Sequence, residues 1–424
     1  MTQLFIGIDF GTSGCRAYAI DEKTTIFASS NTPLPESTVV NGHIVQNPAD
    51  WWQACENTLS DLFRKINRDQ IKTIAVNGTS GTVLLCDKNG TALTNGYMYN
   101  DNACRDEAEQ IKTIAPDESG AHGASSGLSK CLRLLKNNKQ ANIICLNQAD
   151  WIAGNLLNRF DSSDENNALK MGYDPVKREW PSWLHPLNCL HALPATVLQP
   201  GDVSGEISPA IAKYFGVPPS TKIVAGTTDS IAAFVATGSH HIGDAVTSLG
   251  STLAIKLISD KPIFTPKYGV YSHRLGDKWL VGGASNTGGA VLKRFFSNDE
   301  LRQLSSQIDP SQSPGLQYYP LSSAGERFPV NDPLKQPLLS PRPESDTLFL
   351  HGMLESIAKI EKMAFDKLVE LGAPYPTQII TMGGGSQNET WRLIRERICG
   401  IPVINASTAE AAFGTALLAK QGSK

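Results

Sequence analysis

The sequence has no uninterrupted apolar run near the roughly 20 residues that a membrane-spanning helix needs. It begins on a predicted strand, without the charged region, apolar stretch and cleavage site of a secretion signal. Its eight cysteines are scattered and lie mostly in apolar surroundings, which is typical of reduced thiols. We therefore expect a cytoplasmic protein with no disulfides and no membrane partner.

Several functional motifs are also missing. The net charge is −3 and the basic residues are dispersed among acidic ones, so we expect no nucleic-acid partner. The histidines lack the spacing of metal ligands, and no protein-kinase signature is present. The segment nearest to a Gly-x-x-x-x-Gly-Lys-Ser/Thr phosphate loop, Gly123–Lys130, has its lysine in the wrong place.

What the sequence does contain suits a two-domain α/β protein. Its 424 residues are enough for two cores of roughly 200 residues each, and 41% hydrophobic residues with 36 glycines and 25 prolines are ordinary for this class. Both halves open on predicted strands joined by tight turns and continue into helices, so we expect an internal structural repeat. The sequence leaves open whether the protein is a monomer or a homodimer.

The most informative segment is Phe5–Ser13, an apolar run that ends in Asp9 and turns through Gly11. It is typical of a buried strand that leads into a tight turn. Gly11 lets a ligand approach the backbone, and Thr12 and Ser13 add hydrogen-bond donors that suit phosphate oxygens. A carboxylate at the strand end is a suitable ligand for magnesium.

Two later segments repeat this pattern. Val246–Thr252 runs from a β-branched strand into a turn of glycine and hydroxyl residues. Gln378–Asn388 is a predicted strand that ends in three consecutive glycines and is followed by a helix over residues 389–399. Consecutive glycines at a strand end favour close packing of the backbone against a flat or bulky group.

Taken together, these motifs resemble the FGGY carbohydrate kinase family of the actin-like ATPase superfamily. The resemblance covers nearly the whole chain and rests on motifs in family order: Asp9–Thr12, Ser248–Thr252, Gly226–Ala233, Gly383–Asn388, Gly400–Val403 and Glu410–Ala416. Residues 77–87 are most similar to the short ribulose- and xylulose-type sugar kinases of cyanobacteria and plants. The resemblance implies an α/β fold of two actin-like (ribonuclease H-like) domains with a catalytic cleft between them.

The resemblance also implies that the two domains bind different substrates. Residues 1–236 would form the sugar side and residues 237–424 the ATP side, with the last helix, about 409–424, packing back on the first domain. The implied reaction is ATP-dependent phosphorylation of a ketopentose, with D-ribulose to D-ribulose 5-phosphate as the first expectation and D-xylulose or another polyol as the alternative. A nucleotide-dependent binding or regulatory protein without kinase activity is the alternative from another class.

The resemblance assigns residues to each ligand. Asp229 is expected to be the general base and to contact the sugar, although a helix N-cap is its alternative role. Asp9 is expected to hold Mg²⁺, directly or through water. The residues expected to bind the phosphates are Gly11, Thr12, Ser13, Gly250, Ser251 and Thr252. Those expected at the adenosine are Gly383, Gly384, Gly385 and Asn388, with Gly283, Asn286 and Trp391 less certain.

The expected sugar ligands are Ser80, Gly81 and Asp101. Small residues leave room for a polyol, and a serine hydroxyl both donates and accepts hydrogen bonds. Ordinary turn chemistry is the alternative for these residues, because Asn, Asp, Ser and Gly dominate turns.

Overall fold

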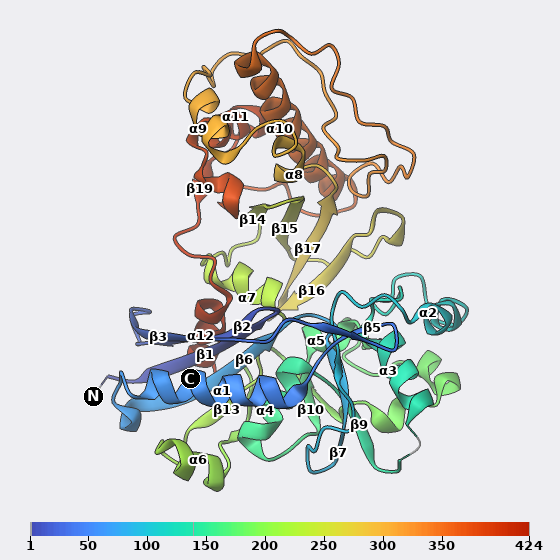
Figure 1. Ribbon diagram of the computed structural model, residues 1–424, viewed down its shortest axis with the longest axis vertical. Coiled ribbons are helices and arrows are strands. Elements are labelled where there is room, and N and C mark those ends of the chain that lie inside the picture. The colour runs from blue at the N-terminus through green and yellow to red at the C-terminus, as the bar shows by residue number, and fades with distance from the viewer. Residues whose placement is uncertain (1, 139, 424) are drawn as a thin grey trace. The chain divides into compact units, whose positions relative to one another are not determined.

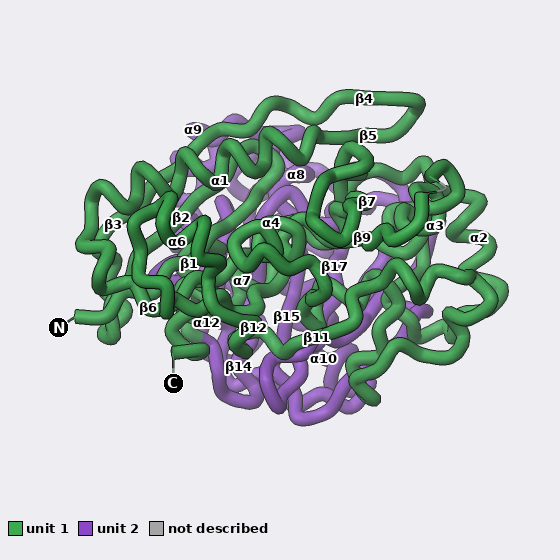
Figure 2. Tube along the Cα trace, turned by 90° about the horizontal axis from the view of Figure 1, so that it is seen from below, with its two compact units in different colours: residues 1–238, 410–424 green, residues 239–409 purple. Residues whose placement is uncertain are grey.

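The computed structural model describes residues 2–138 and 140–423, and the chain forms two compact units. Unit 1 contains residues 1–238 and 410–424, and unit 2 contains residues 239–409 (Figure 2). The chain therefore crosses from one unit to the other twice, and the last segment returns to the unit in which the chain began.

Unit 1 is built on a six-stranded sheet (Figure 1). Strand β1 is antiparallel to β2 and parallel to β6. It is buried along almost its whole length, as expected for a continuous apolar run in the middle of a sheet. The strands, in sheet order, are β12 (Val203–Glu206), β13 (Lys222–Val224), β6 (Ile71–Gly78), β1 (Leu4–Gly11), β2 (Gly14–Ile20) and β3 (Ile26–Pro33).

Two smaller sheets and the helices complete unit 1. A five-stranded sheet contains β4 (Thr38–Val40), β5 (His43–Gln46), β8 (Gly96–Tyr97), β7 (Val83–Asp87) and β9 (Ile143–Asn147), and β10 (Ser162–Asp164) pairs with β11 (Thr196–Leu198). The helices are α1 (Pro48–Phe63), α2 (Arg105–Lys112), α3 (Gly127–Asn137), α4 (Gln148–Leu157), α5 (Glu165–Leu169), α6 (Pro209–Phe215), α7 (Asp229–Ala236) and α12 (Ala411–Gln421). Short 3₁₀ helices lie at Arg68–Gln70, Ser182–Leu187 and Leu190–Ala192.

Unit 2 has one six-stranded sheet and four α-helices among its described residues. The strands, in sheet order, are β16 (Tyr271–Leu275), β17 (Lys278–Ser285), β15 (Leu253–Ser259), β14 (Asp244–Leu249), β18 (Gln378–Met382) and β19 (Val403–Asn405). The helices are α8 (Gly289–Leu292), α9 (Asn298–Ser305), α10 (Asp346–Glu370) and α11 (Glu389–Cys399), with 3₁₀ helices at Pro266–Tyr268 and Gly384–Gln387.

The main sheets of the two units share one topology. In each, the first strand (β1 or β14) lies between an antiparallel neighbour (β2 or β15) and a parallel one (β6 or β18). A third antiparallel strand (β3 or β17) and a second parallel strand (β13 or β19) extend each sheet on opposite sides. This repeat confirms the expected two-domain α/β fold.

Helix α12 is part of the core of unit 1. Its residues Ala416 and Ala419 are buried against Phe5 of β1 and Ala75 of β6. The contact with β1 is so close that a Cβ added at Gly7 would lie 2.1 Å from the backbone nitrogen of Ala416. A side chain on Gly7 would therefore force the helix away from the sheet.

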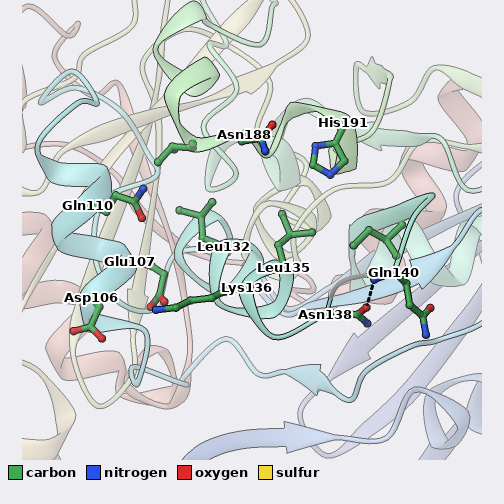
Figure 3. A pocket seen from close by; sticks show the side chains of 12 residues that line it. Asp106, Glu107, Gln110, Leu132, Leu135, Lys136, Asn138, Gln140, Asn188 and His191 are labelled. Carbon is green, nitrogen blue, oxygen red and sulfur yellow. Dashed lines mark hydrogen bonds between the residues drawn. The ribbon is translucent and has the colours of Figure 1, made fainter.

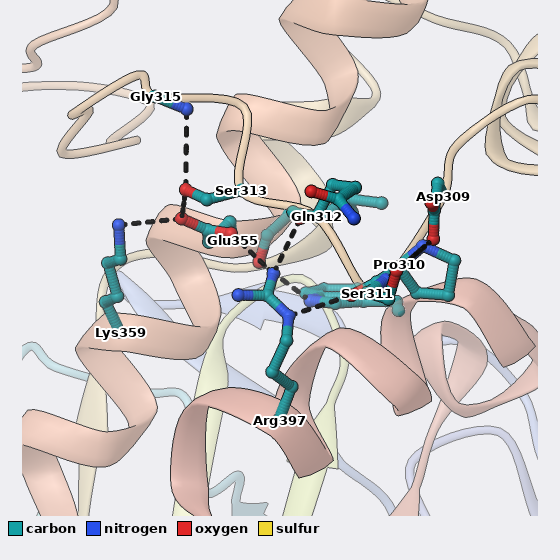
Figure 4. Close-up of polar contacts among 11 residues, drawn as sticks. Asp309, Pro310, Ser311, Gln312, Ser313, Gly315, Glu355, Lys359 and Arg397 are labelled. Carbon is teal, nitrogen blue, oxygen red and sulfur yellow. Dashed lines mark hydrogen bonds and ion pairs between the residues drawn. The ribbon is translucent and has the colours of Figure 1, made fainter.

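The long segment between α9 and α10 in unit 2 is fixed to the helices by polar contacts (Figure 4). Arg397 of α11 donates hydrogen bonds to the carbonyl oxygens of Pro310 and Gln312 and pairs with Glu355 of α10 at 2.6 Å. Glu355 also accepts a bond from Ser313. These contacts order a segment that has little regular structure of its own.

Some helix boundaries differ from the sequence-based expectation. The helix predicted from Asp101 begins only at Arg105, because the Asp101 backbone turns to donate to the Met98 carbonyl. The helix predicted from Thr287 to Phe296 shrinks to α8, because Gly288 has a φ of 144°. Helix α3 and strands β5 and β9 were not predicted at all.

None of the helices within the described ranges combines the length and the apolar character needed to span a membrane.

We predict that Gly7→Ala destabilises the protein by about 3 kcal/mol, because the added methyl group meets backbone atoms that cannot rotate away. Chemical denaturation measures the change. Gly384→Ala is the matched control, since a Cβ there meets no atom within 4 Å. Equal stability of Gly7→Ala and wild type would show that α12 does not pack as described.

Candidate active site

The carboxyl ends of two parallel strands meet at one edge of the unit 1 sheet. Asp9 at the end of β1 lies opposite Asn77 of β6, and Gly78 pairs in parallel with Thr228. Asp229 follows directly as the first residue of α7. Residues far apart in the sequence are thereby brought to the same edge, where ligands commonly bind in α/β sheets.

Asp9 is a buried carboxylate with an unfavourable electrostatic environment. Only 5% of the residue is exposed, and its Oδ2 lies 3.5 Å from Nη1 of Arg16. Burial and the nearby charge of Asp229 raise the pKa of Asp9 to about 6, against the smaller opposing effects of Arg16 and Asn77. The two predicted catalytic carboxylates therefore lie close enough to repel each other.

Asp229 is not the N-cap of the helix that it begins, and its role as general base stays a prediction. The N-cap of α7 is Thr228, so Asp229 is not the capping residue. Its Oδ1 accepts a hydrogen bond of 2.7 Å from the backbone nitrogen of Ser230. The carboxylate is thus oriented at the start of a helix, next to Asp9.

The turn from Gly11 to Ser13 joins β1 to β2, and two of its carbonyl oxygens accept hydrogen bonds from other segments of unit 1. Gln46 donates to the carbonyl oxygen of Thr12, and Leu34 donates to that of Ser13. A Cβ at Gly11 would meet only an Arg16 nitrogen at 3.5 Å and the Gly14 carbonyl oxygen at 3.8 Å. Packing within the protein therefore does not require glycine here.

The loop of residues 78–81 follows β6 at the same edge. Gly81 has a φ of 82°, which favours glycine. The Ser80 hydroxyl is buried without a hydrogen-bond partner, as is that of Thr228. Buried polar atoms normally have partners, so these hydroxyls are candidate ligand contacts.

Asp101 lies in a different environment from that expected of a sugar ligand. It is 1% exposed, its Oδ2 lies 3.0 Å from Nδ1 of His43, and its Oδ1 accepts from the backbone nitrogen of Ile44. Each oxygen therefore has one protein partner, and because a carboxylate can accept further hydrogen bonds, the contact of Asp101 with the sugar stays a prediction.

In unit 2 the two predicted nucleotide segments lie side by side. Residues Gly250–Thr252 form the exposed turn between β14 and β15, and β14 pairs in parallel with β18, which leads to Gly383. A Cβ at Gly383 would lie 2.8 Å from the Leu249 carbonyl oxygen, and one at Gly385 would lie 2.8 Å from the Trp391 ring. Only Gly384 of the three glycines has open space beside it.

The remaining adenosine candidates are engaged by the protein to different degrees. Asn388 caps α11 by accepting from the backbone nitrogen of Trp391 and donates to Ser305. The indole of Trp391 is buried and donates to the Leu354 carbonyl oxygen, so Trp391 is a core residue rather than a stacking surface. The side chain of Asn286 bonds to Gly325 and Arg327.

Sequence reasoning missed three residues that support the site in unit 1. Arg16 pairs with Asp9, the Asn77 side chain donates to Thr415 of α12, and Lys130 bonds to the loop of residues 78–81. The segment Glu410–Ala416 was grouped with the adenosine motifs, yet Thr415 lies behind Asp9 in unit 1. Asn77 could have been identified only by predicting that the strands containing residues 9 and 77 are parallel neighbours, because that pairing places Asn77 opposite Asp9.

A separate cavity of about 440 Å³ lies between α2, α3 and the 3₁₀ helices near Asn188 and His191 (Figure 3). None of the predicted site residues lines it.

Comparison with known proteins gives consistent results. The xylulose kinase of Escherichia coli (strain K12) is 24% identical over 418 residues, covering 94% of this chain and 85% of that protein. The gluconokinase of Bacillus subtilis (strain 168) is 24% identical over 454 residues, covering 97% and 86%. The crystal structure of a xyloylose kinase from Brucella ovis matches the fold with a TM-score of 0.88 at 21% identity, covering 99% and 90%.

Family models account for nearly the whole chain. The N-terminal domain of the FGGY family of carbohydrate kinases matches residues 4–236, and its C-terminal domain matches residues 245–421. The chain therefore belongs to the FGGY family of carbohydrate kinases, and it is a phosphotransferase whose acceptor is an alcohol group.

Proposed function

We propose that this protein transfers the γ-phosphoryl group of ATP to a terminal hydroxyl of a pentulose, forming the pentulose 5-phosphate and ADP. The observation that supports the proposal is the pair of carboxylates, Asp9 and Asp229, at the same sheet edge as the unpartnered hydroxyl of Ser80. This set offers a metal ligand, a base and a polar sugar contact within one unit.

D-xylulose is the first substrate to test, because several relatives of nearly full coverage are named xylulose kinases. D-ribulose, favoured by residues 77–87 of the sequence, is the second. The two sugars differ only in the configuration at one carbon, so one small loop such as residues 78–81 can serve either.

The donor set of Asp9 fits a magnesium ion. A carboxylate oxygen is a preferred ligand, and a cation would offset both the burial of Asp9 and its repulsion by Asp229, the two causes that raise the pKa of Asp9. When bound, magnesium would neutralise charge on the phosphates. We propose that Asp9 holds the ion, directly or through water.

For ATP, we propose that Gly11, Thr12 and Ser13 of unit 1 and Gly250, Ser251 and Thr252 of unit 2 bind phosphate oxygens. The adenosine would lie at Gly384, where the structure leaves open space, with Gly383, Gly385 and Asn388 shaping that segment. Since phosphoryl transfer is mostly positioning and charge stabilisation, these contacts would supply much of the catalysis.

In the reaction, the Asp229 carboxylate would accept the proton of the sugar hydroxyl as its oxygen bonds to the γ-phosphorus. The bond from that phosphorus to the β,γ-bridging oxygen breaks, and ADP leaves with the electron pair. The Ser80 hydroxyl would hold a sugar hydroxyl before and during this step. The phosphoryl group thus passes to the sugar, the proton to Asp229 and the electron pair to ADP.

The proposal is tested by ADP release against D-xylulose, D-ribulose, their L-isomers, gluconate and glycerol. We expect release that depends on a pentulose. Preference for gluconate or glycerol would overturn the proposed substrate class. ATP turnover that is indifferent to every sugar would instead favour a nucleotide-dependent binding protein.

We predict that Asp229→Asn lowers turnover about 10²–10⁴-fold, the usual contribution of a positioned base. ATP binding, measured by calorimetry, should be retained because the substitution keeps the shape of the side chain. Asp61→Asn, an exposed acid of the same unit, is the control. Full activity of Asp229→Asn would place the base elsewhere.

We predict that Ser80→Ala raises KM for the sugar about tenfold with little change in turnover, because it removes a contact that is made before the transition state. Initial rates at varied sugar and saturating ATP measure both constants. An equal fall in turnover at constant KM would instead place Ser80 in the transition state.

We predict that Asp9→Asn abolishes most activity yet stabilises the ligand-free protein above pH 7 by up to about 3 kcal/mol. Burial raises the pKa of Asp9 from 3.8 to about 6, so wild-type stability is highest when this group is protonated and is lost as the pH rises through that interval. Chemical denaturation at pH 4 and pH 8, without Mg²⁺ or ATP, should show the gain only at pH 8. A variant less stable than wild type at pH 8 contradicts this reasoning.

A further inference from the structure

Lys130 of α3 is a completely buried lysine with two carbonyl partners. Its relative exposure is 0%, and its Nζ donates to the carbonyl oxygen of Gly81 at 2.8 Å and to that of Met98 at 2.7 Å. Burying a lysine is unfavourable unless its hydrogen bonds are satisfied and its charge is compensated. The residues around Lys130 must therefore supply both hydrogen-bond acceptors and a compensating negative charge.

Compensation for the charge comes from Asp101. Burial lowers the pKa of Lys130 to about 7, and the Asp101 carboxylate opposes that change, whereas Lys170 adds to it. Asp101 is held in turn by His43 and by the backbone of Ile44. Asp101 thus acts on Lys130 through its charge, and both residues donate to the Met98 carbonyl oxygen, Lys130 through Nζ and Asp101 through its backbone nitrogen.

The two carbonyl groups belong to segments that border the proposed sugar contact. Gly81 ends the loop of residues 78–81 and directly follows Ser80. Met98 also accepts a hydrogen bond of 2.9 Å from the backbone nitrogen of Asp101. Lys130 therefore ties the loop to the 98–101 segment and fixes the orientation of the peptide group between Gly81 and Thr82, one residue beyond Ser80.

Two other roles fit the structure less well. A buried lysine cannot reach the phosphates of a nucleotide in solution, which excludes the function of a phosphate-loop lysine. His43, Asp101 and Cys104 offer ligand atoms within 4.8 Å of one another, but the neighbouring Lys130 ammonium disfavours a metal cation there. Holding the loop is the role that uses every contact of Lys130.

We propose that Lys130 is a positioning residue for the sugar, acting through the Gly81 carbonyl oxygen to hold Ser80 in place for a substrate hydroxyl. This inference rests on the proposed function. It gives the two buried hydrogen bonds of Lys130 a role in substrate recognition, and it names a residue that does not itself contact the sugar.

The test compares Lys130→Met with Lys136→Met, which makes the same change at an exposed position of the same helix. We expect Lys130→Met to raise KM for the preferred pentulose about tenfold or more, with KM for ATP unchanged. Lys136→Met should leave both constants at wild-type values. An unchanged KM for the sugar in Lys130→Met overturns the inference.

The same change in a Ser80→Ala background separates positioning from general damage. If Lys130 acts through Ser80, the double variant should have nearly the KM of Ser80→Ala alone, since coupled residues are not additive. Multiplying effects would overturn the inference. Should Lys130→Met fail to fold, Lys130→Gln, which keeps a side-chain donor but shortens its reach, is measured in the same two backgrounds, and the same outcomes decide. A wild type inactive on every sugar rejects the proposed function itself, whereas an active wild type with unmoved variants rejects only the role of Lys130.

Discussion

The parallel pairing of β1 with β6 is the constraint on which the candidate site of unit 1 depends. Its register places Asp9 opposite Asn77, and on the other side of β6 a separate bridge pairs Gly78 with Thr228, next to the start of α7. A shift of one residue would turn Asp9 to the other face of the sheet. Two features fix this register: the apolar side chains of β1 are buried, and Gly7 is the position at which α12 packs closely on the strand.

The site is held at an energetic disadvantage. The buried carboxylate of Asp9 lies near that of the partly exposed Asp229, and the hydroxyl groups of Ser80 and Thr228 lack partners. The neighbouring carboxylates and the unpartnered hydroxyl groups both reduce the stability of the ligand-free protein. Both suit a protein whose ligands supply a positive charge and hydrogen-bond partners. The surrounding contacts compensate: Thr415 bonds to Asn77, Gln46 holds Thr12, and Lys130 holds Gly81.

Much of this could be predicted from the sequence where the signal is local. The motifs around Asp9 and Asp229 are local, so their resemblance to the family was enough to predict the roles of these residues. Helix α11 was predicted with its observed limits, Glu389–Cys399. Contacts between distant segments could not be predicted. Lys130 bonds to residues 49 and 32 positions away, and His43 to a residue 58 positions away. For the same reason the turn motif around Asp101 did not reveal that His43 and Ile44 bond to its carboxylate.

The contact between Gly7 and α12 has a consequence for synthesis. The helix comes from residues 411–421, whereas the strands that it covers lie within the first 78 residues. Unit 2 is continuous in sequence, whereas unit 1 combines segments that lie before and after it. The unit that is translated first is thus the last to be finished, and the apolar surface around Phe5 and Ala75 stays uncovered on the nascent chain until the final helix emerges.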